Sequence, residues 1–102
     1  MSNPIRVTQE ATAQMIEADR WWRENRPAAR NLFLDELNDA FKMIGNSPHA
    51  GRLYQRSPLR GVRRVLLKAT RFHVYYLPVA EENLVLAVWS ARRGSGPSMA
   101  GR

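Results

Sequence analysis

The segment Val62–Ala91, VRRVLLKATRFHVYYLPVAEENLVLAVWSA, decides the fold of this 102-residue chain. It contains three runs rich in Val, Leu, Tyr and Phe, at Val62–Lys68, Arg71–Val79 and Leu84–Ala91, and such runs are typical of strands. A two-residue link and a four-residue link separate them. Links this short force consecutive strands to run antiparallel. The segment therefore predicts a three-stranded antiparallel meander.

Two amphipathic helices are predicted ahead of the meander. Apolar residues recur at helical spacing in two segments, and Pro27 divides them, because proline disfavours helix in the preceding residue and suits the first turn of a new helix. Thr8 or Thr12 can cap the first helix, and Gly45 marks the end of the second. The run Ile5–Thr8 predicts a short strand before them. The two apolar stripes are Ala11, Met15, Ala18 and Trp22, then Phe33, Leu37, Ala40 and Ile44.

The predicted architecture is an α+β domain, in which a helical hairpin packs on one face of the small antiparallel sheet. Residues 46–61, between the hairpin and the sheet, are predicted to form a loop because they contain two prolines and two glycines. We expect a single domain over residues 1–94. Residues 95–102 are rich in Gly, Ser and Pro, and we expect them to be a flexible tail.

Alternation along a strand assigns each side chain to one face of the sheet. Neither face is plainly polar here, although a sheet with helices on one side only should have a wetter second face. An apolar second face suggests that a partner docks there. The expected faces are Phe72, Val74 and Tyr76 against His73, Tyr75 and Leu77 in the middle strand, and Val85, Ala87 and Trp89 against Leu86, Val88 and Ser90 in the last.

Charge is divided unevenly along the chain. Residues 1–50 carry six Lys or Arg and seven Asp or Glu, a net charge of −1, whereas residues 51–102 carry ten and two, a net charge of +8. The two values add to the overall +7. The basic residues lie within predicted strands and their connections, so we expect one face or end of the domain to attract an anionic partner, either a nucleic acid or an acidic protein segment.

The composition also excludes several classes of site. The chain has no cysteine, which rules out disulfides, thiolate metal sites and cysteine nucleophiles. Its two histidines, His49 and His73, are far apart in the sequence, so we expect no metal and no cofactor. No stretch is apolar enough to span a membrane, and the N-terminus lacks a signal-peptide core. We therefore expect a cytoplasmic protein without a membrane partner.

Four local strings, taken in order, resemble the RelE/ParE superfamily of type II toxin–antitoxin toxins, also known as plasmid stabilisation proteins. They are IGNSP at Ile44–Pro48, GVRRVLL at Gly61–Leu67, FHVYY at Phe72–Tyr76 and VWSARRG at Val88–Gly94. The resemblance covers about residues 5–94. It implies the same architecture: a short N-terminal strand and a helical hairpin packed on a three-stranded meander.

The resemblance implies a cognate antitoxin and one of two targets. The antitoxin would be ParD- or RelB-like, with an acidic C-terminal segment that forms a hetero-oligomer with this chain. RelE-like members cleave mRNA on the translating ribosome, whereas ParE-like members inhibit DNA gyrase and are not known as nucleases. A third reading is an inactive module that binds its antitoxin and adjusts transcription of its operon.

The candidate residues differ between the two branches. An RNA-cleaving site needs groups that activate the 2′-hydroxyl, stabilise the phosphorane and protonate the leaving oxygen. If the chain is a nuclease, the resemblance implies Arg64, His73 and Arg93 for these roles. No Tyr or His follows Arg93, so the terminal acid or base expected of RelE-like members is missing, and this favours the ParE-like branch. Candidates for target or antitoxin binding are Arg63, Arg64, Arg71, His73, Tyr75, Trp89, Arg92 and Arg93.

Overall fold

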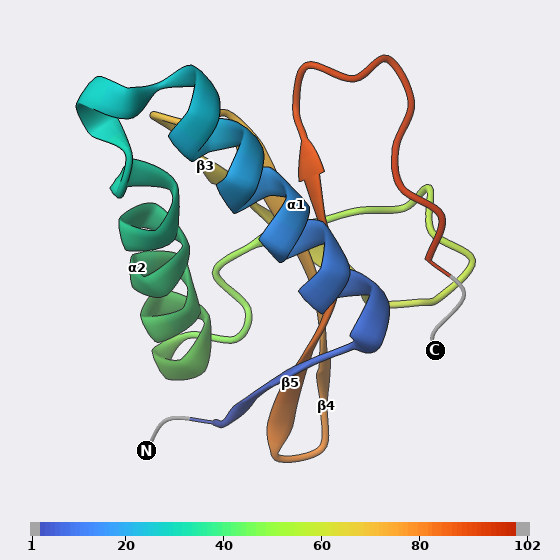
Figure 1. The fold of residues 1–102 in the computed structure, drawn as a ribbon. Coiled ribbons are helices and arrows are strands. Elements are labelled where there is room, and N and C mark those ends of the chain that lie inside the picture. The colour runs from blue at the N-terminus through green and yellow to red at the C-terminus, as the bar shows by residue number, and fades with distance from the viewer. Residues whose placement is uncertain (1–2, 100–102) are drawn as a thin grey trace.

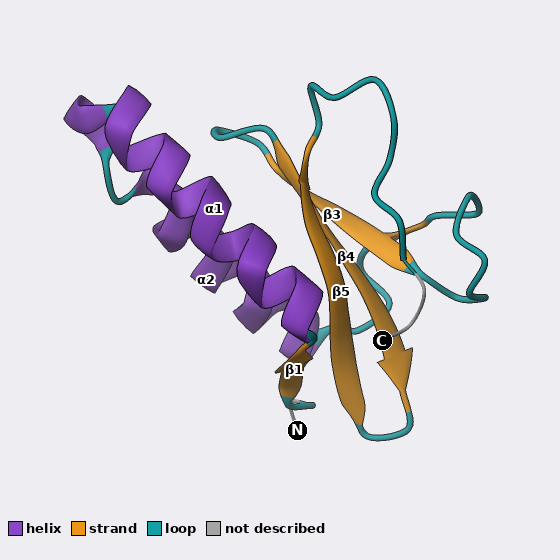
Figure 2. Cartoon of the chain, turned by 45° about the vertical axis from the view of Figure 1, so that its right-hand side comes forward, coloured by secondary structure: helices purple, strands orange, loops and turns teal. Residues whose placement is uncertain are grey.

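The computed structural model describes residues 3–99, which form a layer of helices on one face of a sheet (Figures 1 and 2). The sheet is mixed and five-stranded, with the strand order β1-β5-β4-β3-β2. The helical elements are α1 (Gln9–Asn25), the short 3-10 helix η1 (Pro27–Ala29) and α2 (Leu32–Asn46). The strands are β1 (Ile5–Val7), β2 (Arg52–Leu53), β3 (Arg63–Leu67), β4 (Phe72–Val79) and β5 (Glu82–Ser90).

The predicted helical hairpin, meander and N-terminal strand are confirmed, but the sheet is larger than the meander. β1 pairs with β5 in parallel, which makes the sheet mixed. Residues 46–61 were predicted to be a loop, yet Arg52 and Leu53 pair with Arg64 and Arg63 of β3 as a two-residue edge strand. A strand this short has no alternation that a sequence pattern can reveal, which explains why the prediction missed it.

The helix boundaries differ slightly from those predicted. Of the two candidate caps for α1, the structure uses Thr8, whose side chain accepts a hydrogen bond from the Ala11 N–H at 3.1 Å. Pro27 does not start the second helix. It opens η1 instead, and the Trp22 side chain donates to the Ala29 carbonyl at 2.8 Å, which binds this turn to the end of α1. α2 begins five residues after Pro27, at Leu32.

The main core lies between the helices and the sheet. The predicted apolar stripes of both helices face it, with Ala11, Phe33 and Ile44 fully buried. Tyr76 of β4 is also fully buried there. Its hydroxyl donates to the Pro48 carbonyl at 2.7 Å and accepts from the Gly51 N–H at 3.0 Å, so the start of the 46–61 connection is fastened to the sheet.

A β-bulge between β4 and β5 changes the expected face assignment. Tyr75 pairs with Ala87 and Tyr76 pairs with Val85, so Leu86 is an extra residue in β5. Val85 and Val88 then face the helices, whereas Leu86, Ala87 and Trp89 face the opposite side. The prediction that Val85, Ala87 and Trp89 share one face is therefore wrong, because strict alternation fails at a bulge. The expected faces of β4 are confirmed.

Glu36 of α2 ties the helix layer to the turn between β3 and β4. Its carboxylate accepts hydrogen bonds from the Ala69 N–H at 2.8 Å, the Thr70 N–H at 2.9 Å and the Thr70 hydroxyl at 2.7 Å. Within this turn Arg71 has a φ of 65°, which a non-glycine residue adopts only at a cost. The carboxylate therefore stabilises a turn that is otherwise strained.

We expect Glu36→Ala to lower the free energy of unfolding by about 2 kcal/mol, because two backbone N–H groups and one hydroxyl lose a charged acceptor. Urea denaturation followed by circular dichroism measures the change. Asp39→Ala is the matched control, since Asp39 is an exposed carboxylate on the same helix. Equal stability of the two variants would contradict a structural role for Glu36.

Candidate functional site

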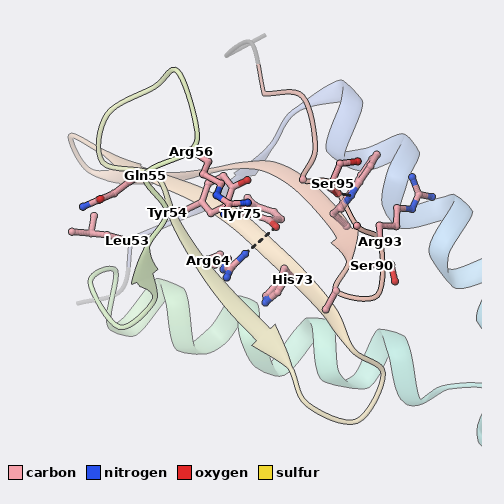
Figure 3. A pocket seen from close by; sticks show the side chains of 14 residues that line it. Leu53, Tyr54, Gln55, Arg56, Arg64, His73, Tyr75, Ser90, Arg93 and Ser95 are labelled. Carbon is pink, nitrogen blue, oxygen red and sulfur yellow. Dashed lines mark hydrogen bonds between the residues drawn. The ribbon is translucent and has the colours of Figure 1, made fainter.

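A polar pocket of about 520 Å³ opens on the face of the sheet away from the helices (Figure 3). Its walls come from β3, β4, the end of β5, the segment after β2 and the chain after β5. Among residues 3–99, three arginines and no carboxylate line it, so we call it the cationic pocket. Its lining residues are Leu53, Tyr54, Gln55, Arg56, Arg64, His73, Tyr75, Trp89, Ser90, Ala91, Arg93, Gly94, Ser95 and Gly96.

Two tyrosines hold the guanidinium of Arg64 at the centre of the pocket. Arg64 of β3 pairs with Tyr75 of β4, and its Nη1 donates a long hydrogen bond of 3.5 Å to the Tyr75 hydroxyl. The guanidinium carbon also lies 5.2 Å from the centre of the Tyr54 ring, within the range of a cation–π interaction. The two rings pack edge to face at 4.9 Å. These contacts leave Arg64 without a carboxylate partner among the residues that line the pocket.

His73 lies next to Arg64 in the pocket (Figure 3). Burial of the ring lowers the pKa of His73 below its ordinary value of 6.5, and the positive charges of Arg64 and Arg71 lower it further. The imidazole is therefore neutral at pH 7. A neutral imidazole can accept a proton or donate one hydrogen bond, but it adds no charge to the pocket.

Arg93 lies at the end of the pocket away from Arg64 (Figure 3), and Trp89 also lines the pocket. The Arg93 guanidinium carbon lies 4.1 Å from the centre of the Trp89 ring. The Trp89 indole donates to the Ser95 carbonyl at 2.8 Å. Trp89 reaches this face because of the bulge at Leu86, so the bulge helps to build the pocket.

The structure brings five of the eight predicted binding residues together in the cationic pocket and places three elsewhere. Arg63 donates from Nη1 to the carbonyls of His49 at 3.0 Å and Gly51 at 2.7 Å, so it secures the 46–61 connection. Arg71 lies in the β3–β4 turn and does not line the pocket, although its charge lowers the pKa of His73. Arg92 lines a different groove. The five in the pocket are Arg64, His73, Tyr75, Trp89 and Arg93.

The groove that Arg92 lines lies between α1 and the end of β5 and measures about 590 Å³. It is mainly apolar, and Trp21, whose side chain is 45% exposed, forms part of it. Arg93 and Trp89 line both this groove and the cationic pocket, so the two sites meet at the end of β5. Arg64, His73 and Arg93, the three residues predicted to act together if the chain is a nuclease, all line the cationic pocket, and Arg93 lies at the end away from Arg64.

Sequence reasoning missed Tyr54, Arg56, Ser95 and Gly96 as pocket residues. They come from a connection and from the chain after the last strand, where no periodicity relates sequence position to a face of the sheet. The excess of arginine in residues 52–60 was the one signal that this connection belongs to the basic surface.

Residues 3–99 contain neither a candidate metal site nor a helix that could span a membrane. No three His, Asp or Glu side chains in this part of the chain come together as a metal site would require. None of the described helices combines the length and the apolar character that crossing a membrane takes.

Comparison with solved structures identifies the fold. A structure titled "Chromosomal ParDE TA system from P. aeruginosa" matches with a TM-score of 0.72 and 15% sequence identity, over 89% of this chain and 98% of that one. A doubly substituted form of the E. coli toxin RelE in the free state matches with a TM-score of 0.51 and 16% identity, over 90% of this chain and 86% of that one. At these identities the similarity establishes a RelE/ParE-like fold.

The sequence itself matches a known family. No curated protein was found to match the chain. The family model described as the ParE toxin of the type II toxin–antitoxin system parDE, however, matches residues 5–94. This range contains both helices, all five strands and most of the cationic pocket. The chain therefore belongs to the ParE toxins of type II toxin–antitoxin systems.

Proposed function

We propose that this ParE toxin acts in the cytoplasm by inhibiting DNA gyrase, and that a cognate antitoxin neutralises it. The observation that carries the proposal is the cationic pocket, a surface of arginine, tyrosine and tryptophan without a carboxylate among the described residues that line it. These three residue types supply most of the binding energy at protein interfaces, because they combine a large contact area with directed hydrogen bonds. Inhibition by docking needs such a surface and needs no catalytic group.

The arginines in the pocket are prepared for an anionic partner. Arg64 is oriented by Tyr54 and Tyr75, and Arg93 is stacked on Trp89, so less side-chain freedom is lost when a carboxylate or phosphate binds. Guanidinium groups bind both anions through two parallel hydrogen bonds. The surface therefore suits an acidic protein segment and also DNA phosphates close to such a segment, which a gyrase–DNA complex offers together.

The proposed antitoxin segment is acidic, amphipathic and disordered until it binds. Its carboxylates would face the basic second half of the chain, and its apolar residues would fill the groove beside Trp21. Opposite charges steer such partners together, so we expect the association rate to fall about tenfold or more between 50 mM and 500 mM salt, as stopped-flow mixing would show. A rate that does not depend on salt would contradict this electrostatic account.

Ribosome-dependent RNA cleavage is the second candidate function, and the neutral His73 beside Arg64 is the observation that favours it. His73 would accept the 2′-hydroxyl proton, and Arg64 would stabilise the charge that develops on the phosphate. Residues 94–102 contain no Tyr or His to protonate the leaving oxygen. For this reason we rank RNA cleavage below gyrase inhibition.

The pair Arg64→Ala/Arg93→Ala tests where the target binds. Expressed in bacteria without the antitoxin, the wild-type protein should block DNA replication and give filamentous cells. The pair should raise the concentration needed for half-maximal toxicity by about 10- to 100-fold, because two oriented arginines are lost from the pocket. Growth curves at graded induction, with protein levels measured by blotting, give this ratio.

The matched control is Arg30→Ala/Arg60→Ala, which removes the same charge from two exposed arginines that do not line the pocket. Undiminished toxicity of a well-folded Arg64→Ala/Arg93→Ala protein would refute the placement of the site. Rapid arrest of translation with mRNA cut at the ribosomal A site would overturn gyrase inhibition. Absence of any growth effect would favour the inactive antitoxin-binding module.

His73 provides a test by pH. In an NMR titration its pKa should lie below 6.5, and Arg64→Ala should raise it only part of the way because burial is the larger cause. Since the folded protein holds this proton more weakly than the unfolded chain, the contribution of His73 to stability is present above pH 6.5 and is lost at lower pH. Arg60→Ala is the control. A midpoint at or above 6.5 would contradict the structure.

His73→Gln separates the two candidate functions. Removal of a general base should lower an RNA-cleaving activity by about 100-fold or more. Removal of one neutral side chain from a docking surface should lower toxicity by no more than about tenfold. Dose–response curves for growth inhibition measure the difference, and a loss of 100-fold or more would count against docking.

A further inference from the structure

The chain after β5 turns back and lies across the face of the sheet that the helices leave open (Figures 1 and 2). Met99 is only 4% exposed and packs in a second apolar cluster with Val62, Tyr75, Leu86 and Ala87. Pro97 is also buried, whereas the neighbouring Ser98 is exposed. Residues 94–99, which we call the strap, therefore cover an apolar surface that the sequence had suggested as a docking face.

Few hydrogen bonds hold the strap in place. Within residues 3–99, the one bond to it from a side chain is donated by the Trp89 indole to the Ser95 carbonyl at 2.8 Å. No backbone hydrogen bond joins residues 94–99 to the described part of the sheet. A methyl group added to Gly96 would meet the Tyr54 hydroxyl and force that side chain to shift, so the strap passes close to Tyr54.

The strap lies on the aromatic side chains that a protein partner would need. Tyr75 is only 2% exposed, because it lies beneath the cluster that Met99 completes. The indole N–H of Trp89 donates to the Ser95 carbonyl, and Gly96 lies against Tyr54. Tyrosine and tryptophan are the usual anchors of protein interfaces. When the strap is closed, it therefore covers Tyr54, Tyr75 and Trp89, three side chains beside Arg64 and Arg93 that a protein partner could bind.

We propose that the strap is an autoinhibitory segment, which opens to expose the Tyr54–Tyr75–Trp89 surface to the toxin's target. The identity of that surface as the target site rests on the proposed function, but the existence of the strap does not. The connection that leads into the strap is exposed over residues 92–96, and Gly94 has nothing within 4 Å of the position of a side chain. A segment that has no backbone hydrogen bonds to the sheet and is held mainly by two buried side chains, Pro97 and Met99, can open locally without unfolding of the rest of the protein.

Opening and binding are linked quantitatively. If the partner binds only the open form, its apparent dissociation constant equals the intrinsic value divided by the open fraction. Closure of the strap therefore raises the apparent dissociation constant by the reciprocal of the open fraction, and it slows reactions of a group at position 99 by the same factor. The open fraction obtained from a reporter at position 99 should therefore agree with the open fraction obtained from toxicity.

The first experiment measures the open fraction. The chain contains no cysteine, so Met99→Cys and Ser98→Cys each place a single thiol in the full chain. In the folded protein we expect the thiol at position 99 to react with a disulfide reagent at least about tenfold more slowly than the thiol at position 98, and we expect equal rates in denaturant. Equal reaction rates of the two thiols in the folded protein would show that residue 99 is not covered, and this would contradict a closed strap.

The second experiment measures its effect on function. Met99→Asp places a charge in the apolar cluster and should open the strap, whereas Ser98→Asp adds the same charge at an exposed neighbouring position. We expect Met99→Asp to be more toxic than Ser98→Asp by about the factor found with the thiols. Equal or lower toxicity of Met99→Asp would overturn autoinhibition. Because growth is the readout, the result does not require gyrase to be the target, and the thiol rates do not require toxicity.

Discussion

The β-bulge at Leu86 is the constraint on which the functional face depends. Tyr76 must point toward the helices, because its hydroxyl is bonded to Pro48 and Gly51 in the connection that follows α2. Opposite Tyr75 and Tyr76, the extra residue in β5 places both Leu86 and Ala87 on the outer face. Val88 returns to the core, and Trp89 then lies on the outer face, where Arg93 stacks on it. Without the bulge, alternation would direct Trp89 into the core, and the cationic pocket would lose one end.

The basic half of the chain becomes a surface because connections, as well as strands, carry it. Arg64 comes from a strand, Arg56 from the connection after β2 and Arg93 from the chain after β5. Concentrated positive charge repels itself, and stacking on aromatic rings partly compensates for this repulsion at Arg64 and Arg93. The remaining repulsion is relieved when an anion binds. Burial lowers the pKa of His73, and the charges of Arg64 and Arg71 lower it further, so the pocket attracts anions mainly through its arginines.

Much of the fold could be predicted from the sequence, and the candidate site could be predicted in part. The apolar stripes of the helices and the strand alternation of β4 report burial directly, so they located the core. The family resemblance and the basic second half of the chain pointed to five of the residues that line the pocket. Arg63 and Arg64, by contrast, are adjacent arginines that no sequence pattern distinguishes, yet the Arg63 side chain donates to the carbonyls of His49 and Gly51. Tertiary contacts of this kind decide which arginine is free to bind, and no local pattern records them. The bulge and the position of Met99 were beyond prediction for the same reason.

A supercoiling assay with purified DNA gyrase tests the central claim most directly. Relaxed plasmid, gyrase and ATP are incubated with increasing amounts of the full-length toxin, without its antitoxin. The account predicts that supercoiling is inhibited in a dose-dependent manner and that adding the antitoxin restores it. Full gyrase activity at toxin concentrations that cut mRNA on purified ribosomes would contradict the account and assign the cationic pocket to RNA cleavage.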